Sequence, residues 1–306
     1  MIDMNVYSVG SFERAEEMRQ FVRDCDAALE RQIEEAISYI ESIPDLRLLG
    51  LTGPTCSGKT TAAGKITRHL SALGLHLHVI SLDDFYYDKE YLHRRAANAD
   101  LEIDYDSEET IDIALLKEQA ERLFEGKETV LPRFDFHTGN REIGERILPT
   151  PRDVFLFEGI QVLYSNVNET LNRDGAFPVI YIAPQSSISV GGEVFEANEL
   201  RLYRRLVRDF RHRSTPPEFT LFLWQSVREN EEKNIFPNVF RCSASIDSTM
   251  PCEVGLLKPY LEQILQTIPV DNAYFERAQG ILKKISAVQP VRAEYMTEKS
   301  LYKEFI

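Results

Sequence analysis

The sequence feature that most constrains this chain is the eight-residue stretch GPTCSGKT, from Gly53 to Thr60. It fits the pattern G-x-x-x-x-G-K-[ST], in which glycines let backbone N–H groups turn inward around a polyphosphate. An apolar run at 46–51 precedes the stretch, and a helical pattern at 60–73 follows it. The chemistry needs this order of strand, loop and helix, because the helix N-terminus adds partial positive charge to the loop. The sequence therefore predicts a site for a nucleoside triphosphate.

The pattern also predicts which residues contact the nucleotide. Lys59 is expected to reach the β and γ phosphates, and the Thr60 hydroxyl is expected to coordinate Mg²⁺. We therefore expect a nucleoside triphosphate and Mg²⁺ as the bound groups, and the pattern leaves open whether the nucleotide is ATP or GTP. The predicted nucleotide-contacting loop comprises Gly53, Pro54, Thr55, Cys56, Ser57, Gly58, Lys59, Thr60 and Thr61.

Composition narrows the classes of partner and compartment. The formal charge of −14 over 306 residues argues against a nucleic-acid backbone or an anionic membrane as the main partner. The four cysteines form no CxxC pair, which disfavours a disulfide framework and a zinc site and favours a reducing compartment. The N-terminal sequence lacks a basic and apolar leader, and no apolar run reaches membrane length. We expect a cytoplasmic protein with a small-molecule substrate, and a homo-oligomer remains open.

Hydrophobic periodicity divides the chain into three parts. Residues 1–45 are predicted to form an N-terminal amphipathic helix over 11–42, with Ser11 as its N-cap. A nucleotide-binding domain that contains the phosphate loop is predicted over 46–253. Residues 254–306 are expected to form a C-terminal helical extension, with helices over 256–268 and 272–285.

The middle part alternates short apolar runs with helical patterns. This alternation predicts an α/β fold, a P-loop NTPase-type parallel sheet with helices on both faces. The polar stretch at 185–198, with its paired glycines, is predicted to be a loop or a small insertion. The predicted strands are 46–51, 76–82, 154–157 and 179–182, and the predicted helices are 60–73 and 108–125.

Acidic residues follow two of these strands. Because ligands of parallel sheets bind at the carboxyl ends of the strands, acids at this edge are candidates for chemistry. Asp83, in the sequence SLDDFY, could orient or deprotonate an attacking hydroxyl or approach Mg²⁺. Its neighbour Asp84 could equally be a solvated acid or a helix N-cap. Glu158 ends the apolar run FLFE, which is the Walker-B arrangement of a carboxylate beside Mg²⁺.

A series of arginines has helical spacing. Such a face would usually mix charges, and in a phosphoryl-transfer enzyme arginines neutralise the charge on the moving γ-phosphate. Two further arginines and Pro216-Pro217 follow, which suggests a movable lid over about 198–217. The spaced residues are Arg201, Arg204, Arg205 and Arg208, and the two that follow are Arg211 and Arg213.

Six motifs in order make the sequence similar to a known family. They are GPTCSGKTT, SLDDFY, DYDSEETID, PRFDFHTGNR, FEGI and RRLVRD, over roughly residues 46–250. In this order they resemble the uridine kinase/phosphoribulokinase family of P-loop kinases, and in particular a divergent bacterial uridine-kinase-like branch. The resemblance implies an ATP-dependent kinase that phosphorylates a small-molecule hydroxyl, most simply the 5′-hydroxyl of a ribonucleoside.

The resemblance also implies roles for individual residues. Asp83 takes the position of the catalytic acid at the sugar hydroxyl, and Asp106 that of the acid that binds the ribose 2′ and 3′ hydroxyls. Phe134 matches an aromatic residue that packs on the nucleoside, and Tyr86 lies in the same substrate region. In the resemblance, Thr60 and Glu158 take the Mg²⁺ positions, and Asp83 could also approach the metal. Arg205 and Arg208 match lid arginines that contact the phosphates, and Arg213 is a further candidate.

The sequence departs from uridine kinases at two base-reading positions. Gly139 stands where the family has a histidine, and Leu223 appears in the place of a glutamine. His137 or Gln225 could replace the missing groups. A phosphoribulokinase, pantothenate kinase or glycerate kinase activity therefore stays open, as does an inactive nucleotide-binding protein. A regulatory GTPase is disfavoured, because the chain has no Asn/Thr-Lys-x-Asp guanine-reading motif.

Overall fold

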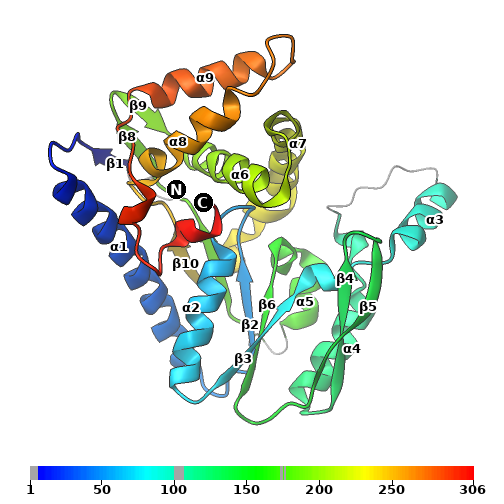
Figure 1. The fold of residues 1–306 in the computed structure, drawn as a ribbon. Coiled ribbons are helices and arrows are strands. Elements are labelled where there is room, and N and C mark those ends of the chain that lie inside the picture. Colours follow the sequence, from blue (N-terminus) through cyan, green and yellow to red (C-terminus); the bar gives the residue numbers. More distant parts are fainter. Residues whose placement is uncertain (1–5, 100–106, 173–174, 176) are drawn as a thin grey trace.

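The computed structural model of the protein describes residues 6–99, 107–172, 175 and 177–306 (Figure 1). Its centre is a five-stranded parallel sheet with the strand order β10-β7-β2-β6-β3. The predicted α/β class is confirmed, and the fifth strand, β10, is one that the sequence analysis did not identify. The strands are β2 (Leu48–Thr52), β3 (His76–Ser81), β6 (Asp153–Glu158), β7 (Val179–Ala183) and β10 (Ala244–Asp247).

Helices cover both faces of this sheet, because alternate strand residues point to opposite sides and both sets are apolar. Leu49 and Leu51 of β2 belong to the core under one group of helices, while Leu48 belongs to the core under the other. The first group is α1 (Ala15–Glu41), α2 (Lys59–Ala72), α6 (Ala197–Arg213) and α8 (Glu253–Leu265), and the second is α4 (Ile113–Phe124) and α5 (Ser165–Leu171).

The N-terminal helix is shorter than predicted. It begins at Ala15, and its N-cap is Arg14 rather than Ser11. The Arg14 and Glu17 side chains form the capping interaction, so the preceding residues are free to leave the helix. Val22, Ile33 and other apolar residues of its inner face are buried in the core, which confirms the predicted amphipathic helix.

The polar stretch at 185–198, predicted to be a loop or a small insertion, is mostly a small β-hairpin. Strand β8 (Ser187–Val190) pairs with β9 (Glu193–Phe195) across Gly191 and Gly192, which both have positive φ. Strand β1 (Val6–Val9), near the start of the chain, adds to β8 in parallel. The apolar positions of this hairpin, such as Ile188 and Phe195, are too few to predict two strands from periodicity.

A second antiparallel hairpin lies beside the sheet (Figure 1). It consists of β4 (Thr129–Asp135) and β5 (Asn140–Ile147), with α3 (Lys89–Ala99) close to its turn, where the Lys89 N–H donates to the Gly139 carbonyl over 2.8 Å. The predicted helix over 108–125 is divided into a helical turn at Glu108–Thr110 and α4.

The remaining helices pack above the carboxyl edge of the sheet. Helix α7 (Pro217–Asn230) continues into a π-helical turn, Glu231–Ile235, and a 3₁₀ turn follows at Phe236–Arg241. Helix α9 (Phe275–Ser286) and α8 confirm the predicted C-terminal helices, each shifted by about three residues at its start. None of the helices in the described part of the chain is long and apolar enough to cross a membrane.

Candidate active site

The predicted phosphate loop connects β2 to α2, and its backbone requires glycine. A Cβ atom on Gly53 would lie 2.0 Å from the Ile182 carbonyl oxygen of β7, and Gly58 adopts φ +98°. Cys56, between them, also has a positive φ of 57°. These left-handed conformations curl the loop over the N-terminus of α2, as phosphate binding by backbone N–H groups requires.

A cavity of about 420 Å³ opens at this edge of the sheet. Four cationic side chains and four carboxylates line it among the described residues. The predicted site residues that line it are Thr55, Cys56, Ser57, Gly58, Lys59, Thr60, Asp83, Tyr86, Glu158, Arg205, Arg208 and Arg213. The structure therefore brings most of the predicted residues together, although their roles stay predictions.

Lys59 and Glu158 both line the cavity, and their opposite charges interact electrostatically. Lys59 Nζ donates to the carbonyl oxygens of Gly53 and Pro54, over 2.9 and 3.1 Å. Burial lowers the pKa of Lys59, and the Glu158 carboxylate opposes this shift. Burial likewise raises the pKa of Glu158, against the effect of Lys59. Both pKa shifts mean that burial disfavours the charged form of each side chain. A bound anion beside Lys59 and a bound cation beside Glu158 would therefore stabilise these charges.

The residues present fit a phosphate group and Mg²⁺. Ser57 Oγ is buried and has no hydrogen-bond partner among the described residues, which is a place for a ligand oxygen. The described residues contain no group of three or more His, Cys, Asp or Glu suited to a metal ion. Mg²⁺ in phosphoryl-transfer sites usually takes one or two protein carboxylates and completes its shell with phosphates and water. Thr60, Glu158 and Asp83 therefore remain the predicted ligands.

Asp83 is held by a residue that the sequence analysis missed. Gln161 Nε2 donates to Asp83 Oδ1 over 2.6 Å and to the Tyr86 hydroxyl over 2.7 Å. Gln161 is buried, and its Oε1 atom has no partner in the described part of the chain. The amide thereby fixes Asp83 and Tyr86 relative to each other. The only sequence signal for this role is the position of Gln161 three residues after Glu158.

Asp84 has a different environment from Asp83. Its Oδ1 atom accepts the Phe134 backbone N–H over 2.9 Å, so it ties the strand β4 to the turn after β3. Burial raises the pKa of Asp84, and the bond from Phe134 partly offsets this. Asp84 therefore makes a structural contact with β4, which differs from both alternatives of the sequence analysis, a solvated acid and a helix N-cap.

An aromatic cluster lies next to Asp83. The Tyr86 and Phe134 rings are 5.6 Å apart, and the Phe134 and Phe136 rings are 5.1 Å apart, both edge to face. Phe134 is half-buried, whereas Phe136 is exposed. Phe134 thus reaches the cavity wall through Tyr86. Asp106, the predicted ribose-binding acid, lies outside the described residues.

Gly139 and Leu223, at the two base-reading positions, do not line the cavity. Gly139 is in the turn between β4 and β5 with φ +72°, and a Cβ atom there would lie 2.9 Å from Lys89 Cβ. Leu223 is half-buried on α7, and Gln225 is exposed and bonds to Glu229. His137 is exposed in the hairpin turn. None of Gly139, Leu223, Gln225 and His137 is among the described residues that line the cavity.

The arginine series on α6 does not form one cationic face. Arg205 and Arg208 line the cavity and both pair with Asp209, at 3.1 and 2.7 Å. Arg213 also lines it, 3.5 Å from Asp209, and its side chain is 58% exposed. The buried Asp209 carboxylate thus forms ion pairs with three arginine side chains. The sequence analysis did not identify this role.

The other two arginines face the interior, which corrects the interpretation of a single cationic face. Arg201 pairs with Glu231 over 2.5 and 2.6 Å, and Arg204 pairs with Glu253 over 2.8 and 3.0 Å. Both pairs are almost fully buried, so they hold α6 against the turn after α7 and against α8. The predicted lid over 198–217 is therefore anchored at its first half, and its mobility remains a prediction.

Three more residues of the predicted site, Thr61, Gly53 and Pro54, have contacts within the protein. The side chain of Thr61 donates to Glu304, which comes from the far end of the chain and itself lines the cavity. Glu304 was missed because nothing near it in the sequence signals a site. The backbone carbonyl oxygens of Gly53 and Pro54 accept hydrogen bonds from Lys59 Nζ.

Comparison with known proteins identifies the family of the chain. The sequence model of the phosphoribulokinase/uridine kinase family matches residues 48–253, about two thirds of the chain. The chain belongs to the phosphoribulokinase/uridine kinase family. The matched range contains the phosphate loop, Asp83, Glu158 and the α6 arginines. The prediction of an ATP-dependent kinase is thereby confirmed at the level of the family.

The individual relatives have low sequence identity to this chain. Uridine-cytidine kinase C from Dictyostelium discoideum is 27% identical over 251 residues, which are 81% of this chain and 48% of that protein. The chain thus spans about half the length of that relative. A uridine kinase from Staphylococcus haemolyticus is 31% identical over 180 residues, 59% of this chain and 76% of that protein. A solved structure of a possible uridine kinase from Bacillus stearothermophilus is 17% identical, with a TM-score of 0.45, and the match covers 72% of this chain and all of that one.

Proposed function

We propose that this protein is a kinase that transfers the γ-phosphoryl group of ATP to the 5′-hydroxyl of a ribonucleoside. The observation that supports this proposal is the convergence of Lys59, Asp83 and Glu158 in one cavity at the carboxyl ends of the sheet strands. A cation for the phosphates, an acid for the acceptor hydroxyl and an acid for the metal are the groups that phosphoryl transfer needs.

Each group has a distinct role in the proposed reaction. Asp83, fixed by Gln161, accepts a hydrogen bond from the acceptor hydroxyl and orients it or takes its proton. Lys59, Arg205 and Arg208 stabilise negative charge on the transferred group. Mg²⁺, when bound at Thr60 and Glu158, would supply charge neutralisation for the β and γ phosphates. The edge-to-face cluster of Tyr86 and Phe134 would pack against the body of the acceptor.

The proposed acceptor selectivity follows from which polar groups are available. Asp106 stands at the position that binds vicinal ribose hydroxyls in this family, and a site built to pair with a hydroxyl strongly rejects an analogue that lacks it. Gly139 and Leu223 offer no hydrogen bonds to a base edge. We therefore expect strong selection for ribose over 2′-deoxyribose and weak selection among bases.

The test is kcat/KM for uridine, cytidine, adenosine, inosine and their 2′-deoxy forms, measured by ADP release. The variant Asp106→Ala is measured alongside, and it should lose the ribose preference. Equal rates for ribo and deoxy substrates would contradict the role of Asp106. An Asp83→Asn variant should lower kcat by about 10² or more with little change in ATP affinity.

A second candidate is phosphorylation of a non-nucleoside alcohol. The observation that favours it is the hairpin turn at Gly139, which packs against Lys89 and has no room for a base-reading side chain. The same ADP-release assay with pentose phosphates, pantothenate and glycerate separates the two candidates. ATP binding without turnover on any of these acceptors would instead support an inactive nucleotide-binding protein.

A further inference from the structure

Residues 291–306, which we call the closing segment, run back from α9 to the phosphate loop (Figure 1). They lie outside the range 48–253 that matches the family. The Val291 N–H donates to the Gly255 carbonyl of α8 over 2.9 Å. Thr297 donates from its N–H and hydroxyl to Asp26 of α1, over 3.0 and 2.8 Å. The closing segment is therefore fixed to two helices before it reaches the site.

Its last turn is seated on the phosphate loop by buried contacts. The side chains of Leu301, Tyr302 and Phe305 are buried. Leu301 lies so close to the loop that a Cβ atom on Gly58 would be 2.3 Å from Leu301 Cδ1. This position leaves the loop glycine covered by the closing segment.

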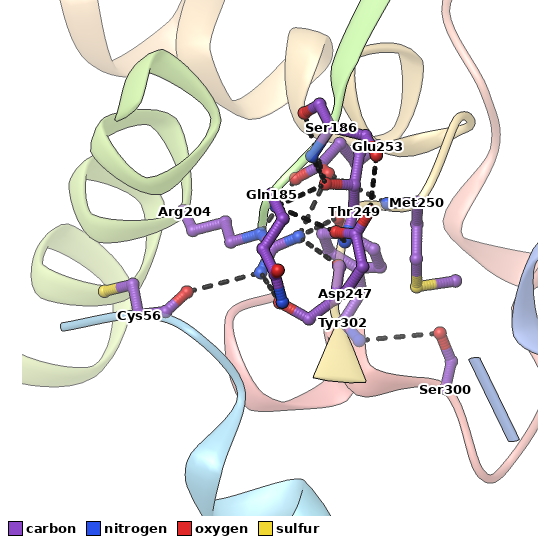
Figure 2. A network of polar contacts seen from close by, with 11 residues as sticks. Cys56, Gln185, Ser186, Arg204, Asp247, Thr249, Met250, Glu253, Ser300 and Tyr302 are labelled. Atoms are coloured by element: carbon purple, nitrogen blue, oxygen red, sulfur yellow. Dashed lines mark hydrogen bonds and ion pairs between the residues drawn. The ribbon is translucent and has the colours of Figure 1, made fainter. Parts of the chain in front are cut away.

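Tyr302 joins the closing segment to the buried arginine of α6. Figure 2 shows Arg204 between Cys56 of the phosphate loop, Glu253 of α8 and Tyr302. Arg204 Nη2 donates to the Tyr302 hydroxyl over 3.1 Å, and Arg204 Nη1 donates to the Cys56 carbonyl over 3.3 Å. One guanidinium thus holds both the loop backbone and the segment that covers it.

These contacts bring the Glu304 carboxylate to the N-terminus of α2. Glu304 Oε2 accepts the Thr61 hydroxyl over 2.9 Å and the Thr61 backbone N–H over 3.3 Å. Thr61 is the third residue of α2, so its N–H has no carbonyl partner within the helix and is suited to an anion. Lys59 is meanwhile bonded to the Gly53 and Pro54 carbonyls. Lys59 and Thr61, which would both donate to a bound phosphate, therefore have hydrogen-bond acceptors within the protein.

We propose that Glu304 occupies a phosphate position on α2 and that the closing segment lowers the affinity of the site for nucleoside polyphosphates. A bound polyphosphate and the Glu304 carboxylate compete for the Thr61 donors, and they repel each other as like charges. Binding then selects the fraction of molecules in which Glu304 has moved away, which weakens the apparent affinity by that fraction. This inference rests on the proposed nucleotide site, but it does not depend on the acceptor.

The test is the Kd of Mg·ATP, measured by calorimetry, for the full-length protein and three variants. Glu304→Gln keeps the side-chain volume and removes the charge, and Glu304→Ala also removes the acceptor. Both should bind ATP more tightly, by about tenfold, as expected for the loss of one partly screened like charge. Glu298→Gln is the matched control, because Glu298 is a closing-segment carboxylate whose side chain is 94% exposed. It should bind as the unaltered protein does.

A second measurement follows the closing segment directly. ATP should increase the hydrogen exchange of residues 300–306, because the segment loses its contact with Thr61. Unchanged or weaker binding by both Glu304 variants would overturn the inference while leaving the nucleotide site intact. Failure of every form to bind ATP would overturn both the inference and the proposed function. Tighter ATP binding by the Glu304 variants, without turnover of any nucleoside, would support the inference. It would refute only the proposal that the acceptor is a nucleoside.

Discussion

The hydrogen bonds of Gln161 predict a catalytic effect that can be separated from folding. Replacing Gln161 by Met keeps the approximate volume and removes the donor to Asp83 Oδ1 and to the Tyr86 hydroxyl. A hydrogen bond to a charged group contributes about 1.5–3 kcal/mol. If this energy holds Asp83 in the reactive orientation, its loss should lower kcat by roughly 10- to 150-fold.

The same variant should leave nucleotide binding and stability nearly unchanged. Within the described part of the chain, the hydrogen bonds of Gln161 go to Asp83 and Tyr86 and not to the phosphate loop, and its Oε1 atom already lacks a partner there. We therefore expect an unaltered Kd for Mg·ATP and a melting temperature within about 3 °C of the parent protein.

The assay is steady-state ADP release at saturating acceptor, with calorimetric ATP binding and thermal unfolding on the same samples. Gln225→Met is the matched control, because Gln225 is an exposed glutamine on α7 that bonds to Glu229. A Gln161→Met protein with normal kcat would refute the positioning role. A parallel fall in kcat, ATP affinity and melting temperature would show that the residue acts through the fold instead.

Three further predictions concern other parts of the site. Lys59→Ala should abolish turnover and leave the protein folded, as judged by its circular dichroism; near-normal activity would overturn the phosphate-loop assignment. Asp84→Asn should keep kcat within a few-fold and raise the melting temperature at pH 8, because burial raises the pKa of Asp84 and so penalises its charge in the folded state. That gain in melting temperature should shrink as the pH falls through the raised pKa of Asp84, and it should vanish near pH 4. A gain that grows toward acid pH would contradict the upward direction of the pKa shift. Glu253→Gln should lower the stability by about 3–5 kcal/mol in urea unfolding, since it leaves the Arg204 charge buried and unpaired; a loss below about 1 kcal/mol would show that the pair is dispensable.

The parts of the fold that could be predicted are those with a local signal. The strand at 48–52, the loop at 53–58 and the helix at 59–72 each have their own pattern, so their order predicted the nucleotide site. Acids after β3 and β6 were predictable because parallel strands end at the same edge of the sheet. The hairpin at 187–195 was not, because its strands are short and mostly polar.

The α6 arginines show why the rest could not be predicted. Helical spacing places Arg201, Arg204 and Arg208 near one another, but it does not say whether they face a ligand or the core. That depends on Glu231 and Glu253, which are 30 and 49 residues away in the sequence. The contact between Thr61 and Glu304 spans 243 residues and has no local pattern on either side. Partners brought together only by the tertiary fold leave no trace in periodicity.

The long separation between the loop and the closing segment has a consequence during translation. Thr61 and Glu304 are 243 residues apart, and Asp26 and Thr297 are 271 apart. At about 5–20 residues per second, a ribosome needs roughly 12–50 s to pass from the loop to the segment that covers it. During that time the nascent chain already contains Thr61, whereas Glu304 has not yet been synthesised. A nucleotide that bound the loop at this stage would therefore not compete with Glu304.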